Sequence, residues 1–310
     1  MYPLLLRTYD NSGEPVKPII AADSGLYENS EIFLLSGRDT GESVIKNGEF
    51  EDLGLNEVLT RLKTAALTPG RGFPVLIKFI NTVERLPVKV YADDEYAALH
   101  GENTGKTSLI YIADCKKGAE MVYGLKRNVT PEELKTRVQN GSLSAICNFV
   151  SVQKGDVFFV PPGVVFAIGG GIAAIEISAN SDSEFLISDY GRLGPDGKPR
   201  PLQINKALEV MKIRKNNLRY GNTGELTLYP FGTVRELGDC DIFSSELISM
   251  DGNVGVYEDE KIISLVLVSG EVDMSYPSGT MHLKAGNSVL IPARVKAKLS
   301  GRAEIIYTRI

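Results

Sequence analysis

Residues 153–171 read Gln-Lys-Gly-Asp-Val-Phe-Phe-Val-Pro-Pro-Gly-Val-Val-Phe-Ala-Ile-Gly-Gly-Gly, so strand-forming and turn-forming residues alternate over a short distance. Val157 to Val160 is β-branched and aromatic, and Pro161-Pro162-Gly163 stops any helix and forces a tight reversal. We expect a second strand from Val164 to Ile168 and a third from Ile172 to Ile177. Short strands separated by Gly and Pro are typical of antiparallel sandwiches and barrels, so the chain is predicted to be all-β.

The composition is that of an ordinary globular protein and argues against several classes of partner. The chain has 310 residues, of which 43% are hydrophobic and 24% charged, which is enough for two domains. A net charge of −5 gives no basic surface for nucleic acid or for an anionic membrane, so neither partner is expected. Three scattered cysteines predict reduced thiols, and the lack of a signal peptide or a long apolar run predicts a cytoplasmic protein.

Helices are predicted at four places between the strands, one of them beginning at the acidic triplet Asp93-Asp94-Glu95. Apolar residues at helical spacing indicate one helix from Asn56 to Ala66. Thr130, followed by proline and two glutamates, has the chemistry of a helix start, and this helix should run to about Asn140. A further helix, from Gln203 to Lys212, would connect the two halves of the chain.

The chain resembles the cupin proteins and, more narrowly, the class I mannose-6-phosphate isomerases of the short bacterial type. The resemblance rests on the segment from Gly155 to Ile168 and on later motifs that match the family in order. These motifs are Glu176-Ile177, Asn180-Ser181-Asp182, Asp189-Tyr190-Gly191-Arg192 and Gly197-Lys198-Pro199-Arg200. Upstream, the strand-like segments Phe73 to Ile80 and Leu86 to Tyr91 also resemble family segments.

The resemblance implies two cupin, or jelly-roll, domains with a few inserted or connecting helices. We expect an N-terminal cupin-like domain at 1–200, a helical connector at 201–219 and a smaller C-terminal cupin-like domain at 220–310. In the last of these, a strand from Ile262 to Val268 and a turn at Ser269-Gly270-Glu271 repeat the order of strand and glycine turn seen earlier.

The family holds a catalytic zinc ion with Gln, His, Glu and His side chains, and this chain departs from all four. The resemblance places those ligands at Lys89, Tyr91, Ser108 and Phe166. Lysine brings a positive charge to the place of a cation, phenylalanine has no donor atom and serine is a poor neutral ligand. We therefore expect no zinc cofactor and no metal site, and Lys89 could replace the cation electrostatically.

Four charged residues in matching segments are predicted to bind the sugar and its phosphate: Lys78, Lys106, Asp189 and Arg192. The resemblance also makes Lys106 and Arg192 candidates for catalytic roles. Lysine and arginine suit phosphate because they offer point charge and bidentate donors. The alternative is that both lysines are solvated and that Asp189 and Arg192 form only a local salt bridge.

These observations favour a mannose-6-phosphate isomerase-like protein without the zinc ligands. The protein would bind a sugar phosphate such as mannose 6-phosphate or fructose 6-phosphate with little or no isomerisation, or it would act as a regulatory homologue of the isomerases. The alternative is an active aldose–ketose isomerase that interconverts those two sugars. A third hypothesis is a structural or regulatory subunit with a closed pocket. The sequence leaves the oligomeric state open.

Overall fold

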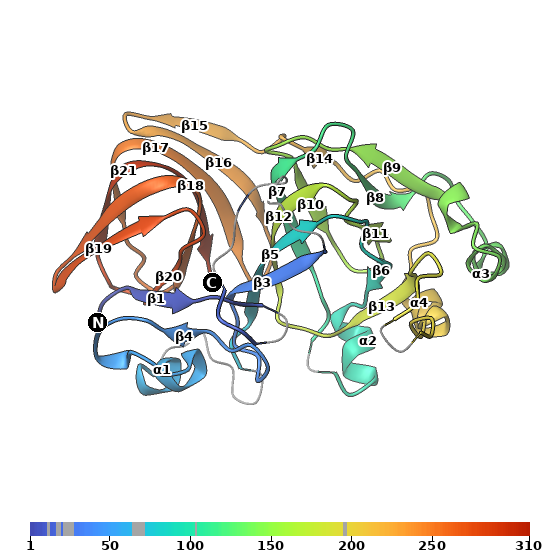
Figure 1. Cartoon of the computed structure of the whole chain (residues 1–310), viewed down its shortest axis with the longest axis horizontal. Coiled ribbons are helices and arrows are strands. Elements are labelled where there is room, and N and C mark those ends of the chain that lie inside the picture. Colours follow the sequence, from blue (N-terminus) through green and yellow to red (C-terminus); the bar gives the residue numbers. More distant parts are fainter. Residues whose placement is uncertain (11–12, 17–19, 21–27, 64–71, 103, 195–196) are drawn as a thin grey trace.

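Strands dominate the computed structural model, which describes residues 1–10, 13–16, 20, 28–63, 72–102, 104–194 and 197–310. Within these residues the strands form three sheets of nine, seven and five strands. The nine-stranded sheet curls at the left of Figure 1, the five-stranded sheet lies at the right, and the seven-stranded sheet lies between them. The prediction of an all-β fold with a few inserted helices is confirmed.

The seven-stranded sheet is central. Its strands, in spatial order, are β14 (Tyr220–Gly221), β10 (Val157–Val160), β7 (Ser108–Cys115), β12 (Ile172–Ala179), β5 (Val75–Thr82), β3 (Ser30–Leu35) and β2 (Tyr9–Asp10). β5 and β12 are buried along their whole length and pair antiparallel over eight residues, which sets Lys78 directly opposite Glu176. The inward face of this sheet therefore carries a charged pair between apolar neighbours.

The five-stranded sheet faces the seven-stranded sheet. Its strands, in spatial order, are β13 (Glu184–Ser188), β6 (Val88–Tyr91), β11 (Phe166–Ala167), β8 (Glu120–Leu125) and β9 (Cys147–Ser151). Aromatic and aliphatic side chains from both sheets meet in one buried cluster, among them Tyr91, Tyr123, Phe158 and Phe166. Two facing antiparallel sheets around such a core are the arrangement of a cupin.

The nine-stranded sheet joins the two ends of the chain. Its strands, in spatial order, are β15 (Leu226–Tyr229), β16 (Gly232–Asp239), β17 (Ser244–Val256), β21 (Ala297–Arg309), β18 (Ile263–Tyr276), β20 (Ser288–Ile291), β1 (Leu4–Arg7) and β4 (Val44–Ile45), with β19 (Gly279–Lys284) paired to β18. The N-terminal strand β1 thus pairs with β20, so the first residues of the chain complete a sheet built mainly by the last ninety. The domain boundaries at 200 and 219 stay a prediction.

The short helices lie at the periphery. They are α1 (Leu55–Arg61), α2 (Asp94–Leu99), α3 (Pro131–Gln139) and α4 (Ile204–Val210), with single 3₁₀ turns at Gly48–Phe50 and Leu143–Ala145. The predicted start of α3 is confirmed, because the Thr130 hydroxyl accepts a hydrogen bond from the Glu133 amide at 3.1 Å. No helix among the described residues combines the length and the apolar character needed to cross a bilayer.

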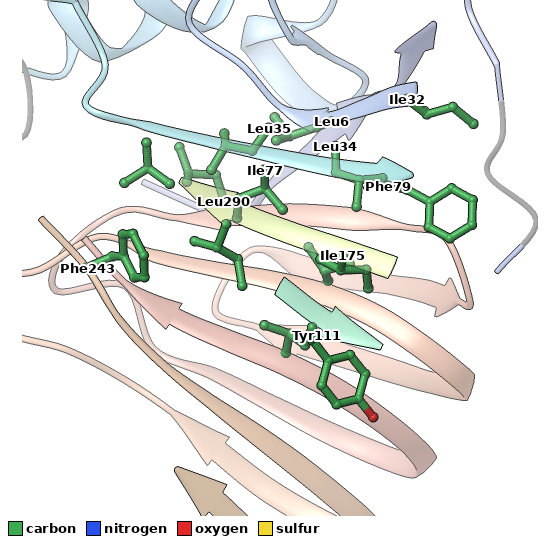
Figure 2. Close-up of a cluster of buried hydrophobic side chains, with 14 of the residues drawn as sticks. Leu6, Ile32, Leu34, Leu35, Ile77, Phe79, Tyr111, Ile175, Phe243 and Leu290 are labelled. Carbon is green, nitrogen blue, oxygen red and sulfur yellow. The ribbon is translucent and has the colours of Figure 1, made fainter. Parts of the chain in front are cut away.

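Successive side chains on the strands of the central sheet point to opposite faces, so the sheet contributes to two hydrophobic cores. Ile77, Phe79, Tyr111 and Ile175 point away from the five-stranded sheet and pack with residues of the nine-stranded sheet, including Leu290 (Figure 2). The intervening residues on the same strands point toward the five-stranded sheet. Each fully buried aliphatic or aromatic side chain stabilises the fold by about 1.5–3 kcal/mol, so these two cores hold the central sheet in place from both faces.

Some sequence predictions are corrected in detail. The helix expected from Asn56 to Ala66 is α1, which ends at Arg61, and residues 64–66 lie outside the described part of the chain. The strand expected from Val164 to Ile168 is reduced to β11, and the helix from Gln203 to Lys212 is reduced to α4. The turn expected at Ser269-Gly270-Glu271 is wrong, because β18 continues through it with a bulge. The bulge lies between Leu267 and Ser269, and the next residue, Gly270, has a φ of 76° and a position where a Cβ atom would lie 2.1 Å from the Arg302 carbonyl oxygen.

Candidate functional site

Three lysines and three glutamates form a buried network between the two facing sheets. We call Lys78, Lys89, Lys106, Glu31, Glu176 and Glu184 the lysine–glutamate network. Its first half is centred on Lys78 of β5, whose Nζ lies 2.9 Å from Glu31 Oε2 on β3 and 3.0 Å from Glu176 Oε2 on β12. Lys78 and Glu176 are only 6% and 1% exposed, so each requires the other as a counter-charge.

The second half of the network is centred on Glu184 at the start of β13. Lys106 Nζ donates to its Oε2 at 2.7 Å, and Lys89 Nζ donates to both carboxylate oxygens at 3.2 and 3.3 Å. The residue before Lys106 is Gly105, where a Cβ atom would lie only 2.4 Å from the backbone of Asp93. This close approach brings Lys106, 3% exposed, into the interior beside α2.

Burial works against the charged forms of Lys78, Lys106, Glu176 and Glu184, and the pKa shifts show that the opposite charges outweigh burial for all of these but Lys106. Burial would raise the pKa of Glu176, but attraction to the lysines, Lys78 foremost, lowers it to about 2. The pKa of Glu184 is likewise held far below its usual range. Burial would lower the pKa of Lys78, yet its two glutamate partners raise it. Lys106 is the exception, because burial there lowers the pKa. The carboxylates of Glu176 and Glu184 therefore stay ionised at neutral pH.

The structure brings the four predicted ligand positions together at this network. Tyr91 Oη donates to Glu176 Oε1 at 2.8 Å and accepts from Ser108 Oγ at 3.3 Å. The rings of Tyr91 and Phe166 meet edge to face with centroids 4.9 Å apart. Lys89 Nζ lies 5.7 Å from the centre of the Phe166 ring, so all four side chains share one closely packed region.

These side chains do not fit the zinc ion that the family resemblance implies. Burial, with Glu176 and Glu184 nearby, raises the pKa of Tyr91 well above its usual value, so its hydroxyl acts as a neutral donor to Glu176. The Lys89 amine donates to a carboxylate, whereas zinc is held by Cys, His, Asp or Glu. Over the residues that the structure describes, no group of three or more such side chains is placed to hold a metal.

A cavity of about 350 Å³ borders the network on one side. Its lining includes Glu31, Lys89 and Glu184 from the network, together with Asp189, Arg192 and Arg200 from the segment after β13. Two larger cavities, of about 560 and 620 Å³, contain none of the predicted site residues. The smaller cavity is therefore the candidate site, because it alone of the three joins ionised groups from the network to the predicted binding residues.

Asp189 and Arg192 lie at this cavity as a locked pair. Arg192 Nε donates to Asp189 Oδ1 at 2.9 Å, Nη2 contacts the same oxygen, and Nη1 donates to the Arg85 carbonyl at 2.9 Å. Tyr190 lies between these two residues in the sequence and has a φ of +57°. The centre of its ring lies 5.4 Å from the central carbon of the Arg192 guanidinium. The salt bridge of the alternative is therefore present, but Arg192 also contacts Arg85 and Glu84 far away in the sequence, and the role of the pair in binding stays a prediction.

The predicted binding residues fall into two groups. Asp189 and Arg192 line the cavity. Lys78 and Lys106 do not line it, but they form ion pairs with Glu31 and Glu184, which do. The alternative that both lysines are solvated is wrong, since each is at least 94% buried.

Sequence reasoning missed Glu31 and Glu184 as members of the site. The sequence did contain a signal for them, namely Lys78 and Lys89 within the apolar segments of β5 and β6. A lysine that points inward from a strand requires a carboxylate from another strand. Both histidines are exposed; the His100 ring stacks on Tyr96, and His282 lies beside Asp273.

Comparison with known proteins finds relatives that cover most of the chain. No protein-family model matches it. It is 30% identical over 287 residues to the mannose-6-phosphate isomerase ManA of Bacillus subtilis (strain 168), covering 90% of this chain and 89% of that protein. The crystal structure of the mannose 6-phosphate isomerase from Bacillus subtilis matches over 100% of both chains, with a TM-score of 0.86 and 25% identity. A variant of phosphomannose isomerase from Salmonella typhimurium shares the fold, with a TM-score of 0.74 at 13% identity over 98% of this chain and 99% of that one.

Proposed function

The chain belongs to the mannose-6-phosphate isomerase family, and from that premise we propose that it binds a sugar phosphate with little or no isomerisation. The ligand would be mannose 6-phosphate or fructose 6-phosphate, in keeping with the names of its relatives. The binding site would be the cavity bordered by Lys89, Glu184 and Arg200.

One observation carries this proposal: the lysine–glutamate network and the Tyr91–Phe166 pair occupy the region where the family resemblance places zinc. Isomerisation of an aldose to a ketose moves a proton between C1 and C2 through an enediolate, and a metal lowers that barrier by stabilising the oxyanion. Removing several kcal/mol of such stabilisation slows a reaction roughly a thousandfold or more. Binding, in contrast, needs only a cavity with suitable donors and acceptors.

The cavity offers such groups for sugar hydroxyls. Carboxylate oxygens of Glu31 and Glu184 can accept hydrogen bonds, and the Lys89 ammonium can donate them. A volume of about 350 Å³ falls near the lower end of the range for small-molecule sites, roughly 300–1,000 Å³. These features suit a compact polar ligand and not a long or apolar one.

A second candidate is slow, metal-free isomerisation, favoured by the contact between Lys89 and Glu184 at the cavity. The ammonium could stabilise an enediolate oxygen while the carboxylate takes the proton. The low pKa of Glu184 counts against this function, because a carboxylate stabilised in its ionised form is a weak base. Any turnover would therefore be far below that of a zinc enzyme.

Elemental analysis of the purified, untagged protein, combined with an isomerase assay with and without added zinc, tests the proposal. Calorimetric titration with both sugar phosphates provides the binding readout. We expect no stoichiometric metal, little or no turnover, and saturable binding that Lys89→Met weakens but Lys261→Met, at an exposed turn, does not. Stoichiometric zinc with robust zinc-dependent turnover would contradict the proposal, and a failure to bind either sugar phosphate would instead favour a structural subunit.

A further inference from the structure

We infer that Arg200, and not Arg192, binds the phosphate group of the ligand, while the sugar hydroxyls face Lys89 and Glu184. This inference rests on the proposed function and deepens it, because it assigns an orientation to the ligand. It starts from the hydrogen bonds of the two arginines that line the cavity.

Arg192 has little capacity left for a ligand. Its Nε and Nη2 are used by Asp189, its Nη1 by the Arg85 carbonyl, and Glu84 lies 3.6 Å from the same Nη1. A phosphate that takes these donors must first break contacts with a carboxylate that is only 6% exposed. Stripping Asp189 of this partner is costly, because a buried charge would lose its best hydrogen bonds.

Arg200 has the opposite properties. Its side chain is 57% exposed, and its Nε is 3.5 Å from Asp189 Oδ2, at the outer limit of hydrogen bonding. Among the described residues, no carboxylate other than Asp189 pairs with it. Just before Arg200, the Gly194 amide donates to the Lys198 carbonyl, and Leu193 forms a bridge with Pro199, so these contacts help to fix the position of the chain next to Arg200. Its guanidinium is thus positioned at the cavity with donors to spare.

The charges around the cavity support the same assignment. The lysine–glutamate network balances three lysines against three glutamates, so it offers no net charge to a phosphate dianion. Elsewhere in the cavity lining, Asp189 is shared by Arg192 and Arg200, and the further partner of Arg192, Glu84, is 72% exposed to solvent. The two arginines share one buried carboxylate, and Arg200 makes the longer contact with it, so Arg200 is the less compensated cation of the pair and the one from which a phosphate gains the most.

Calorimetric titration of four proteins tests this assignment: wild type, Arg200→Met, Arg200→Lys and Arg302→Met, an exposed arginine of the nine-stranded sheet. Each is titrated with mannose 6-phosphate and with mannose. Because Arg200 is exposed, its replacement should leave thermal unfolding unchanged. We expect Arg200→Met to weaken binding of mannose 6-phosphate about 10- to 100-fold, the usual effect of losing charge-assisted hydrogen bonds. Mannose affinity should stay unchanged, and Arg200→Lys should recover part of the loss.

The salt dependence gives a second readout that a purely structural role would not change. In wild type, added NaCl should weaken binding of mannose 6-phosphate, and Arg200→Met should make that dependence shallower. If Arg200→Met binds mannose 6-phosphate as wild type does, the inference is overturned while sugar-phosphate binding stands. The same holds if wild type does not prefer mannose 6-phosphate to mannose. If wild type binds neither sugar phosphate, the proposed function fails and the assignment of Arg200 fails with it.

Discussion

Glu176 keeps a negative charge in the interior only because its neighbours compensate for it. It is 1% exposed, its Oε2 lies 3.0 Å from Lys78 Nζ, and its other oxygen accepts from Tyr91. Breaking a buried ion pair by removing one partner typically costs about 3–5 kcal/mol. The network is therefore costly to alter one member at a time, whether or not it adds net stability over an apolar core.

We predict that Glu176→Gln lowers the free energy of unfolding at pH 7 by about 3–5 kcal/mol, measured by urea denaturation. The matched control is Glu57→Gln, which breaks an exposed ion pair with Arg61 on α1 and should cost no more than about 0.5 kcal/mol. Equal effects of the two substitutions would show that the buried pair is not required.

The pH dependence of stability follows from the same carboxylate. Its folded-state pKa of about 2 lies below the ordinary value of 4.5, so ionisation stabilises the folded state above pH 4.5. This contribution, about 3 kcal/mol at 1.4 kcal/mol per pKa unit, is lost as the pH falls from about 4.5 toward 2. Wild-type stability should fall steeply over that window, and Glu176→Gln should flatten the profile.

The candidate site could be predicted from the sequence only in part. Lys78, Asp189 and Arg192 belong to recognisable motifs, but their contacts depend on residues far away in the chain. Lys89 pairs with Glu184, which is 95 residues away, and periodicity gives no means of joining two such strands. Arg192 Nε lies 2.9 Å from an oxygen of Asp189, whereas Arg200 Nε lies 3.5 Å from the other oxygen. This difference in hydrogen bonding cannot be predicted from the spacing of residues in the sequence.

At the level of elements, local chemistry explains which predictions held. β10 was predicted with its observed bounds because Gly155 and Pro161 enclose a β-branched and aromatic run. α3 was predicted because Thr130 and Pro131 carry a start signal that needs no tertiary partner. The turn expected at Gly270 failed because pairing of β18 with β21 continues past the glycine, so tertiary pairing overrode a local turn signal.

Gly169, between β11 and β12, provides a test at this scale. A Cβ atom there would lie 1.8 Å from the carbonyl oxygen of Glu120, and the Gly169 carbonyl accepts from Thr82 Oγ1 at 2.6 Å. We predict that Gly169→Ala destabilises the protein by more than about 2 kcal/mol or prevents folding, because backbone atoms must move. Gly255→Ala on β17, where no atom lies within 4 Å of the new Cβ, should change stability by less than about 0.5 kcal/mol. Similar melting temperatures for the two variants would count against the described packing.

At the scale of the whole molecule, the two halves of the sequence share one core. Leu4 and Leu6 of β1, side chains of the seven-stranded sheet and Leu290 of β20 belong to a single buried cluster (Figure 2). β1 and β4 also extend the sheet built by the C-terminal strands, while β14 extends the central sheet. Cutting the chain at the predicted connector would thus break sheets and expose apolar faces on both sides.

We predict that residues 1–219 and 220–310, produced separately, each fail to fold, and that the full chain unfolds in a single cooperative transition. Circular dichroism, binding of a hydrophobic dye and calorimetric melting would report this directly. A soluble 1–219 fragment with its own sharp melting transition would show instead that the predicted domain boundary marks an independent folding unit.

The pairing of the buried charges also limits how this sequence can change over evolutionary time. Loss of one partner costs about 3–5 kcal/mol, a large part of the roughly 5–15 kcal/mol by which a native protein is stable. A single substitution of Lys78, Lys106 or Glu176, each of which is buried, should bring the protein close to the threshold of unfolding, and selection is expected to remove such variants. We therefore expect the buried members of the network to change together and not singly, even where the ligand exerts no selection.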